Sequence, residues 1–175
     1  NNPLGGFMAL EDIAIGAFIY IFPAYIANSS AALFGGGKPL DFGKKLKDGR
    51  RIFGDGKTFR GSFAGIFFGA LTGYLMGLIA ADQTYFYLTL GLFLSIGAIL
   101  GDIIGSFMKR RAGIERGKPV PLLDQWDFLL TAVVFGSIIS TPSLDWFTFL
   151  LMATPFIHMF VNTFGFLLRL KPVPW

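Results

Sequence analysis

Long uncharged runs divide this chain into five hydrophobic segments. The runs between consecutive charged residues cover 13–37, 61–81, 83–101, 128–144 and 146–168. A bilayer core of roughly 30 Å requires about 20 apolar residues per helix, so each run is long enough if the fourth begins inside the preceding DQWD segment. The pattern predicts an all-α integral membrane protein with five transmembrane helices. We place them at about residues 10–34, 61–81, 83–107, 125–143 and 145–168, in a single membrane domain over 1–175.

Composition agrees with a membrane protein. Hydrophobic residues make up 53% of the 175 residues, and charged residues only 15%. A soluble domain typically contains about 25% charged residues, so this class is excluded. The first segment has neither a basic N-terminal flank nor a small-residue cleavage pattern, so we expect a retained helix rather than a signal peptide.

Basic residues predict the orientation, because Lys and Arg are retained on the cytoplasmic side of membrane helices. All 15 lie in the long loop 38–60, the loop 108–124 and the C-terminal tail. The two short connections on the opposite side carry acidic residues, Asp82 and Asp145. We therefore expect a multi-pass protein of the cell membrane with the N-terminus outside, the C-terminus cytoplasmic and two long cytoplasmic loops. Any active face would then be cytoplasmic.

Glycine recurs at every fourth position in the second predicted helix, and three more glycines follow this spacing in the third. Small residues allow helices to approach closely in lipid, so we expect these stripes to pack against each other. A lipid tail along the glycine groove is the alternative. The positions are Gly61, Gly65, Gly69, Gly73 and Gly77, then Gly97, Gly101 and Gly105.

The segment GDGKTFRG, which closes the first basic loop, has the composition of a phosphate-binding turn. Glycines free the backbone to surround an anion, and a helix N-terminus adds amides that favour phosphate. It is not a Walker A loop, because Arg51 stands where that motif requires glycine. A basic turn held at anionic headgroups is the alternative. The candidate substrate-binding residues are Gly54, Asp55, Gly56, Lys57, Thr58 and Arg60.

The segment GDIIGSFMKRR places polar residues along one face at the end of the third helix. Asp102, Ser106 and Lys109 or Arg110 follow helical spacing. A carboxylate within an apolar run is unfavourable, so by default it indicates function. The alternative is a structural ion pair between Asp102 and a basic neighbour.

The segment DQWDF brings two further aspartates to the start of the fourth helix. Asp124 and Asp127 are three residues apart and hence neighbours on one helical face. Carboxylate oxygens suit Mg²⁺, although the pair could equally cap the helix and complement its dipole. Together with Asp102, they place three carboxylates beside two strongly basic loops. This combination favours a metal that binds a polyphosphate, and we expect Mg²⁺ as the cofactor.

Two further pairs of polar residues, in the last and the first helix, are not included in the candidate site. His158, the only histidine, and Asn162 lie one turn apart in the last helix, where an interhelical hydrogen bond is the expected role. They are left outside the candidate site. Asn28 and Ser29 lie deep enough in the first helix to face a reaction chamber.

The order of these motifs resembles a known enzyme family. Gly101-Asp102, Ser106 and Lys109-Arg110, followed by Asp124 and Asp127, is similar to the signature of the CDP-diacylglycerol synthases. The chain lacks the Lys-Asp pair and His-Gly-Gly segment of the bacterial and eukaryotic enzymes. Its basic loop ending in GDGKT and its small size resemble the archaeal branch, the CDP-archaeol synthases. The resemblance is strong over residues 38–128.

The resemblance implies a reaction and roles for the candidate residues. CMP would be transferred from CTP to unsaturated archaetidic acid, a glycerol phosphate with two ether-linked geranylgeranyl chains, giving CDP-archaeol and pyrophosphate. Asp102, Lys109, Arg110 and Asp124 would be catalytic, and Asp102, Asp124 and Asp127 would hold Mg²⁺. Lys57, Thr58 and Arg60 would bind the triphosphate, while Ser106 and Arg111 would also contact substrate.

Other classes remain open on the residues alone. A transporter or channel for an anionic or phosphorylated solute would also combine basic loops with membrane carboxylates, but it would normally show polar residues through the span or an inverted repeat. A lipid-binding assembly factor is a third option, which nucleotide binding would distinguish from an enzyme. The expected partners are CTP, the ether lipid phosphate and membrane lipids, with no nucleic acid. The oligomeric state is left open.

Overall fold

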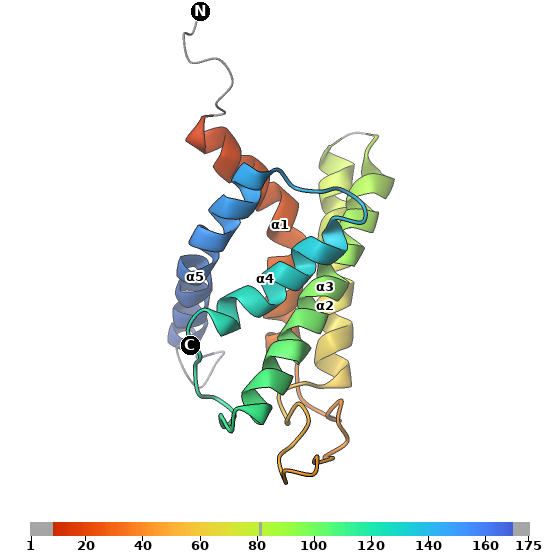
Figure 1. Cartoon of the computed structure of the whole chain (residues 1–175). Helices are drawn as coiled ribbons and strands as arrows, with labels where there is room; N and C mark the ends of the chain where they lie inside the picture. Colours follow the sequence, from red (N-terminus) through yellow and green to blue (C-terminus); the bar gives the residue numbers. More distant parts are fainter. Residues whose placement is uncertain (1–8, 81, 170–175) are drawn as a thin grey trace, which may run out of the picture.

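Five α-helices, running alternately down and up, form the molecule (Figure 1). The computed structural model describes residues 9–80 and 82–169. Within this part the helices are α1 (Leu10–Leu33), α2 (Phe59–Ile79), α3 (Thr84–Arg111), α4 (Leu123–Gly136) and α5 (Leu144–Leu167). The prediction of five helices is confirmed, and four of them begin and end within a few residues of the expected ranges. The expected end of the second helix, residue 81, lies outside the described residues, and so do residues 170–175 of the C-terminal tail.

Helix α4 departs most from the prediction. It contains 14 residues and so measures about 21 Å, which is shorter than a bilayer core. Among the described residues, the helices long and apolar enough to cross a membrane are therefore α1, α2, α3 and α5. The expected range 125–143 is wrong because the chain leaves the helix after Gly136. Pro142 lies within the expected range, and proline disfavours helix in the preceding residue, so a helix continuous to residue 143 was disfavoured; a search for charged residues alone overlooks this signal.

The two basic connections lie at the same end of the molecule (Figure 1). The first joins α1 to α2, and the second joins α3 to α4. The connection between α2 and α3, which contains Asp82, and the start of α5, where Asp145 lies in the first turn, are at the opposite end. This arrangement gives the molecule one strongly basic pole, as the distribution of Lys and Arg predicts.

The glycine stripe of α2 is in contact with two helices. All five of its glycines are buried. A Cβ atom at Gly73 would collide with the backbone oxygen of Tyr87 on α3, and one at Gly61 would lie 2.7 Å from the backbone oxygen of Ala31 on α1. The expectation of tight helix packing is therefore confirmed.

The glycine stripe of α3 has a different partner from the one expected. Cβ atoms at Gly97, Gly101 and Gly105 would collide with α4, at Thr131 and Asp127. The prediction that this stripe packs against that of α2 is wrong, since Gly91 and Ser95 form the α3 face toward α2. The reason is geometric: α3 lies between two helices and needs small residues on both faces.

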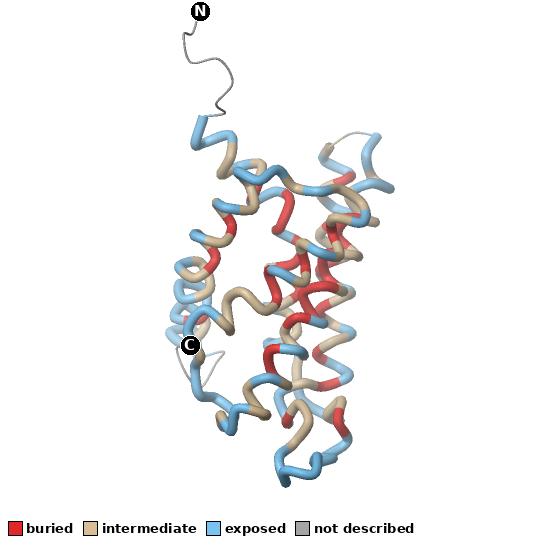
Figure 2. Tube along the Cα trace, in the orientation of Figure 1, coloured by how far each residue is buried: buried red, intermediate tan, exposed pale blue. Residues whose placement is uncertain are grey.

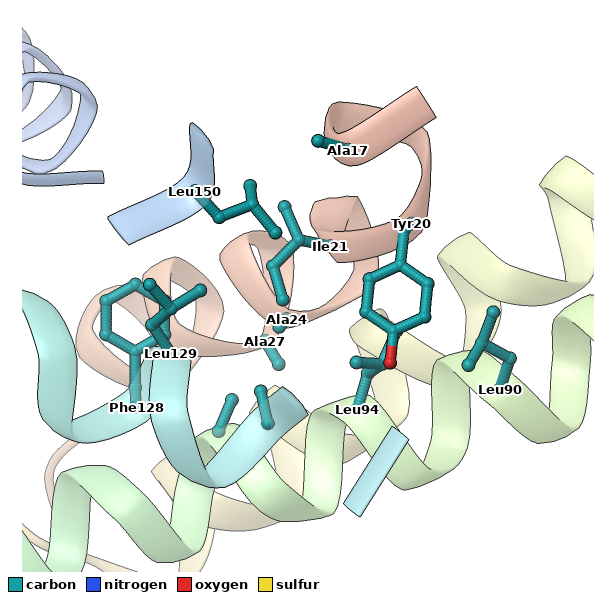
Figure 3. Close-up of a cluster of buried hydrophobic side chains, with 12 residues drawn as sticks. Ala17, Tyr20, Ile21, Ala24, Ala27, Leu90, Leu94, Phe128, Leu129 and Leu150 are labelled. Atoms are coloured by element: carbon teal, nitrogen blue, oxygen red, sulfur yellow. The ribbon is translucent and has the colours of Figure 1, made fainter. Parts of the chain in front are cut away.

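The core lies where α1, α3, α4 and α5 meet (Figures 2 and 3). Ile21 and Leu94 are fully buried there, together with Phe128 and Leu150. Tyr20 adds a hydrogen bond at the edge of this core: its hydroxyl donates to the backbone oxygen of Ser140 at 3.0 Å. In contrast, large side chains on the outer faces of α2 and α5 are exposed, as expected for surfaces in contact with lipid.

Helix α5 is joined to α4 at a proline. Pro155 lies inside α5 and has no N–H to donate to the carbonyl of Leu151, four residues earlier. The indole Nε1 of Trp126 donates to this oxygen at 3.0 Å. A neighbouring helix thus satisfies the carbonyl that the proline frees, which is the condition for proline within a membrane helix.

Candidate active site

A cavity of about 560 Å³ opens at the basic pole. Its walls come from α1, the end of the first basic loop, α3, the start of α4, and α5. One part of the lining is charged, and another is formed by apolar side chains of α1 and α5. The cavity therefore connects a polar chamber to an apolar wall.

Two lysine–aspartate pairs cross the charged part of the cavity. Nζ of Lys57 lies 2.5 Å from Oδ2 of Asp102, which joins the loop before α2 to the middle of α3. Nζ of Lys109 lies 2.7 Å from Oδ1 of Asp124, which joins the end of α3 to the first turn of α4. Asp124 also accepts a hydrogen bond of 2.9 Å from the amide of Val120. All four charged side chains are partly buried and line the cavity.

Asp127 also lines the cavity and forms no ion pair within the described part of the chain. It lies beside Gly105, where a Cβ atom would collide with its carboxylate. The interpretation of Asp127 as a cap of the fourth helix is wrong, because α4 begins at Leu123 and Asp127 lies in its second turn. Glycine at position 105 thus provides the space that the Asp127 side chain occupies.

The structure brings seven of the predicted site residues into the cavity lining and leaves six outside it. Those in the lining are Gly56, Lys57, Thr58, Asp102, Lys109, Asp124 and Asp127. Those outside it are Gly54, Asp55, Arg60, Ser106, Arg110 and Arg111. Thr58 has a second role, since its hydroxyl caps α2 by accepting a hydrogen bond from the amide of Gly61 at 3.1 Å.

Several of the outlying residues hold the basic loop in place. Arg111 forms an ion pair with Asp48 and donates to the backbone oxygen of Arg51 at 2.5 Å. Arg60 donates to the backbone oxygen of Phe34 at 2.9 Å, at the end of α1. Asp55 pairs with Arg51 at 2.6 Å on the surface.

Arg110 and Ser106 differ from this group. Ser106 is buried in α3. Nε of Arg110 is buried and has no hydrogen-bond partner among the described residues. Its side chain lies against Gly54, while Arg116 lies against Gly56 and lines the cavity. Two guanidinium groups thus flank the glycine turn.

Comparisons with known proteins assign the family. The family profile described as "CarS-like: CDP-archaeol synthase" matches residues 10–175. The chain belongs to the CDP-archaeol synthase family. The CDP-archaeol synthase of Pyrococcus abyssi is 49% identical over 163 residues, covering 91% of this chain and 96% of that protein. That of Methanocaldococcus jannaschii is 45% identical over 166 residues, covering 89% and 94%.

A solved structure agrees with this CDP-archaeol synthase assignment. It is described as an intramembrane enzyme for archaeal membrane lipids biosynthesis, is 39% identical, and has a TM-score of 0.78. The match covers 85% of this chain and 93% of that one. The expectation of a CTP-dependent nucleotidyltransferase of the CDP-archaeol synthase type is confirmed, and the transporter alternative is set aside.

Sequence reasoning missed some of the residues that line the cavity of this CDP-archaeol synthase family member. Arg116 of the second basic loop, together with His158 and Asn162, is not among the predicted site residues, yet all three line it. The amide of Asn162 lies 3.0 Å from Nδ1 of His158 on the same helix. The one-turn spacing of two polar residues in an apolar helix was the available signal. Asn28 and Ser29 line the cavity as expected.

The carboxylates fit a magnesium ion that a polyphosphate brings with it. No group of three metal-ligating side chains is preformed within the described ranges 9–80 and 82–169. Mg²⁺ does not need one, since it typically binds through one or two carboxylates together with substrate phosphates and water. Asp127 supplies carboxylate oxygens next to the cavity without a competing lysine within hydrogen-bond distance. Asp102 and Asp124 each carry a lysine as a counter-ion.

Proposed function

We propose that this protein transfers CMP from CTP to unsaturated archaetidic acid at the cytoplasmic membrane face, with Mg²⁺, giving CDP-archaeol and pyrophosphate. One observation carries the proposal. A single cavity joins two lysine–aspartate pairs at the basic pole to an apolar wall between α1 and α5. A water-soluble polyphosphate and a membrane lipid are the two substrates that such a cavity suits.

The charged part suits the triphosphate. Lys57 of the first basic loop and Lys109 at the end of α3 line it, and Arg116 adds a guanidinium beside Gly56. A bound triphosphate would offer these cations stronger partners than the carboxylates they contact in the free protein. The buried Nε of Arg110, without a partner among the described residues, is available at the adjoining turn.

The apolar part suits the lipid chains. Phe18, Phe22 and Ile26 of α1 line it, opposite Ile157 and Val161 of α5. Phe18 and Phe22 are 37% and 44% exposed, so this apolar wall is accessible rather than sealed inside the bundle. A prenyl chain entering there would bring its glycerol phosphate toward the charged chamber.

The chemistry requires positioning and charge neutralisation. A non-bridging oxygen of the lipid phosphate attacks the α-phosphorus of CTP, a new P–O bond forms, and the bond to the β-phosphate oxygen breaks as pyrophosphate leaves. A phosphate monoester is mostly dianionic at neutral pH, because its second pKa is about 6, so no general base is needed. Lysine and arginine side chains stabilise the charge that develops on the leaving group.

The proposed magnesium ion would be held by Asp127 with Asp102 and Asp124. It would supply further charge neutralisation between the phosphates. Asp102 and Asp124 would exchange their lysines for the metal, while Lys57 and Lys109 turn to the phosphates. The chain's own residues would then provide opposite charges on both sides of the triphosphate.

The test is pyrophosphate release by the purified protein in detergent. We expect release only when CTP, Mg²⁺ and a geranylgeranyl ether glycerol phosphate are all present. ATP, GTP and UTP, and the same lipid without its phosphate, serve as controls. Equal use of all four nucleotides would contradict the cytidine assignment. Equal use of a diacyl glycerol phosphate would contradict the ether-lipid assignment, and activity in EDTA would contradict the role of the metal.

A further inference from the structure

Asp41 is a buried carboxylate in the middle of a basic, mostly exposed loop. Its side chain has no exposed surface, whereas those of Asp48 and Asp55 in the same loop are 39% and 60% exposed. It lies outside the cavity lining. A buried charge is unfavourable unless it is paired and hydrogen-bonded, so its partners define what it does.

Five hydrogen bonds converge on this one carboxylate. Arg51 donates from Nη2 at 2.6 Å and from Nε at 3.2 Å. The backbone amides of Phe53 and Gly54 donate to Oδ2 at 3.0 and 2.9 Å, and that of Gly43 donates to Oδ1 at 3.1 Å. Burial by itself raises the pKa of Asp41, but Arg51 and these amides together hold it well below its usual range. The carboxylate is therefore charged and joins three parts of the loop.

The Gly54 amide links this network to the active site. Gly54 begins the glycine turn, and its carbonyl accepts a hydrogen bond from the amide of Lys57 at 3.3 Å. The carbonyl of Lys57 in turn accepts from the amide of Leu40 at 2.8 Å, next to Asp41. The N–H and the C=O of Lys57 are thus both hydrogen-bonded to residues next to Asp41 or held by its carboxylate. Its side chain then reaches Asp102 in the cavity.

We propose that Asp41 and Arg51 are positioning residues for CTP: their buried ion pair fixes the glycine turn so that Lys57 points into the cavity. The inference rests on the proposed role of Lys57 in binding the triphosphate. Neither residue touches substrate. Without the ion pair, three backbone amides would lose their acceptor and the turn from Gly54 to Thr58 would sample other conformations. Nucleotide binding would weaken, while the apolar wall that receives the lipid would be unchanged.

The experiment compares Michaelis constants for the two substrates. In the pyrophosphate assay, Asp41→Asn and Arg51→Lys should each raise KM for CTP by about tenfold, which corresponds to a loss of about 1.4 kcal/mol of binding free energy. KM for the lipid phosphate should change less than twofold. A loss of folded protein would lower the apparent kcat but leave both KM values unchanged, so the ratio separates positioning from stability. Glu115→Gln, an exposed carboxylate in the other basic connection, is the matched control and should leave both constants unchanged.

Two further variants separate the possible failures. Lys57→Ala should raise KM for CTP more than Lys47→Ala, whose side chain is on the exposed part of the loop. If Lys57→Ala has no such effect, the proposed triphosphate role of Lys57 is wrong. If Lys57→Ala has the effect but Arg51→Lys and Asp41→Asn leave KM for CTP unchanged, the positioning role is wrong. Should Asp41→Asn yield no folded protein, Arg51→Lys alone decides.

Discussion

Two of the three aspartates in the cavity are paired with lysines, and the third faces the space left by a glycine. Asp102 and Asp124 pair with Lys57 and Lys109, so the charged chamber is nearly neutral before substrate enters. Asp127 has no lysine within ion-pair distance in the described structure. The same residue type therefore takes two environments, one paired with a lysine and one without an ion-pair partner among the described residues.

Replacing either paired aspartate tests the metal site. Asp102→Asn and Asp124→Asn keep size and hydrogen bonding but remove the charge that a divalent ion requires. We expect turnover to fall by at least about 100-fold, as for loss of groups around a metal. The check is cytidylyl transfer across a Mg²⁺ titration, with thermal stability measured in parallel. Near-normal turnover at low Mg²⁺ would identify these aspartates as structural partners of the lysines.

The pH dependence of stability should report on Asp41. Its depressed pKa means that the folded state favours the charged carboxylate. The stabilisation is fully present above the unfolded pKa of about 3.9, and it is lost as the pH falls from there toward the lower folded pKa. Thermal stability of the wild-type protein should therefore fall progressively below about pH 4, and should continue to fall as the pH approaches the lower folded pKa. Asp41→Asn should be less stable at pH 7 and show a shallower decline; parallel curves would argue against this role.

At the scale of helices, one hydrogen bond and one glycine determine how α4 packs against α5 and α3. The indole of Trp126 ties α4 to the proline site of α5, and Gly105 lets α4 bring Asp127 against α3. Both features position α4, which contributes residues to the cavity wall. The first concerns stability of the α4–α5 contact, and the second concerns the position of a functional side chain.

Trp126→Phe should destabilise the protein by about 1–3 kcal/mol, because the carbonyl of Leu151 would lose its only substitute for the missing proline amide. Trp146→Phe is a matched control. The Nε1 of Trp146 is buried without a partner in the described structure, so its removal breaks no hydrogen bond. Thermal unfolding in detergent measures both. Equal losses of stability would show that packing of the rings, rather than the hydrogen bond, matters.

Gly105→Ala and Gly101→Ala should separate function from stability. A Cβ at Gly105 would collide with the carboxylate of Asp127, which can rotate away, whereas a Cβ at Gly101 would collide with the backbone oxygen of Asp127, which cannot. We expect Gly105→Ala to lose activity with a small change in stability. Gly101→Ala should lose about 1–3 kcal/mol of stability, as overpacking does. The reverse pattern would show that the Asp127 carboxylate is not needed.

The whole molecule has one basic pole (Figure 1), and charged residues of that pole, Lys57, Lys109 and Arg116, line the cavity. In the proposed reaction, the nucleotide would approach from water and the lipid from the membrane side of α1 and α5. The orientation in the membrane remains a prediction from the distribution of Lys and Arg.

Cysteine labelling tests this orientation directly, since the chain contains no cysteine. A thiol reagent that cannot cross the membrane should label cysteines introduced at position 82 or 145 from outside. It should label those at 45 and 115 only after the membrane is made permeable. Labelling of intact cells in the reverse sense would place the cavity on the outer face.

Hydrophobic run lengths, charge and motif order determined much of this protein by themselves. They predicted five helices, because spanning a bilayer imposes a minimum length on each apolar run, and a single basic pole. In the described structure α4 is nevertheless too short to be such a span. They also indicated a function for the lysines and aspartates of GDGKT, GDIIGSFMKRR and DQWDF, because charged side chains are unfavourable near lipid and usually mark a functional site. The resemblance of these motifs then indicated the family that the comparisons confirm.

The tertiary structure decided which charges meet and which helices touch. The resemblance implied that Arg111 contacts substrate, and the folded loop brings Asp48 and the Arg51 carbonyl to it. Asp41 looked like one loop charge among many, and only the chain's return after Arg51 buries it. The early end of α4 and the contact of the α3 glycines with α4 depend on packing across the bundle. Such contacts join residues distant in sequence, and periodicity within one segment carries no information about its partner.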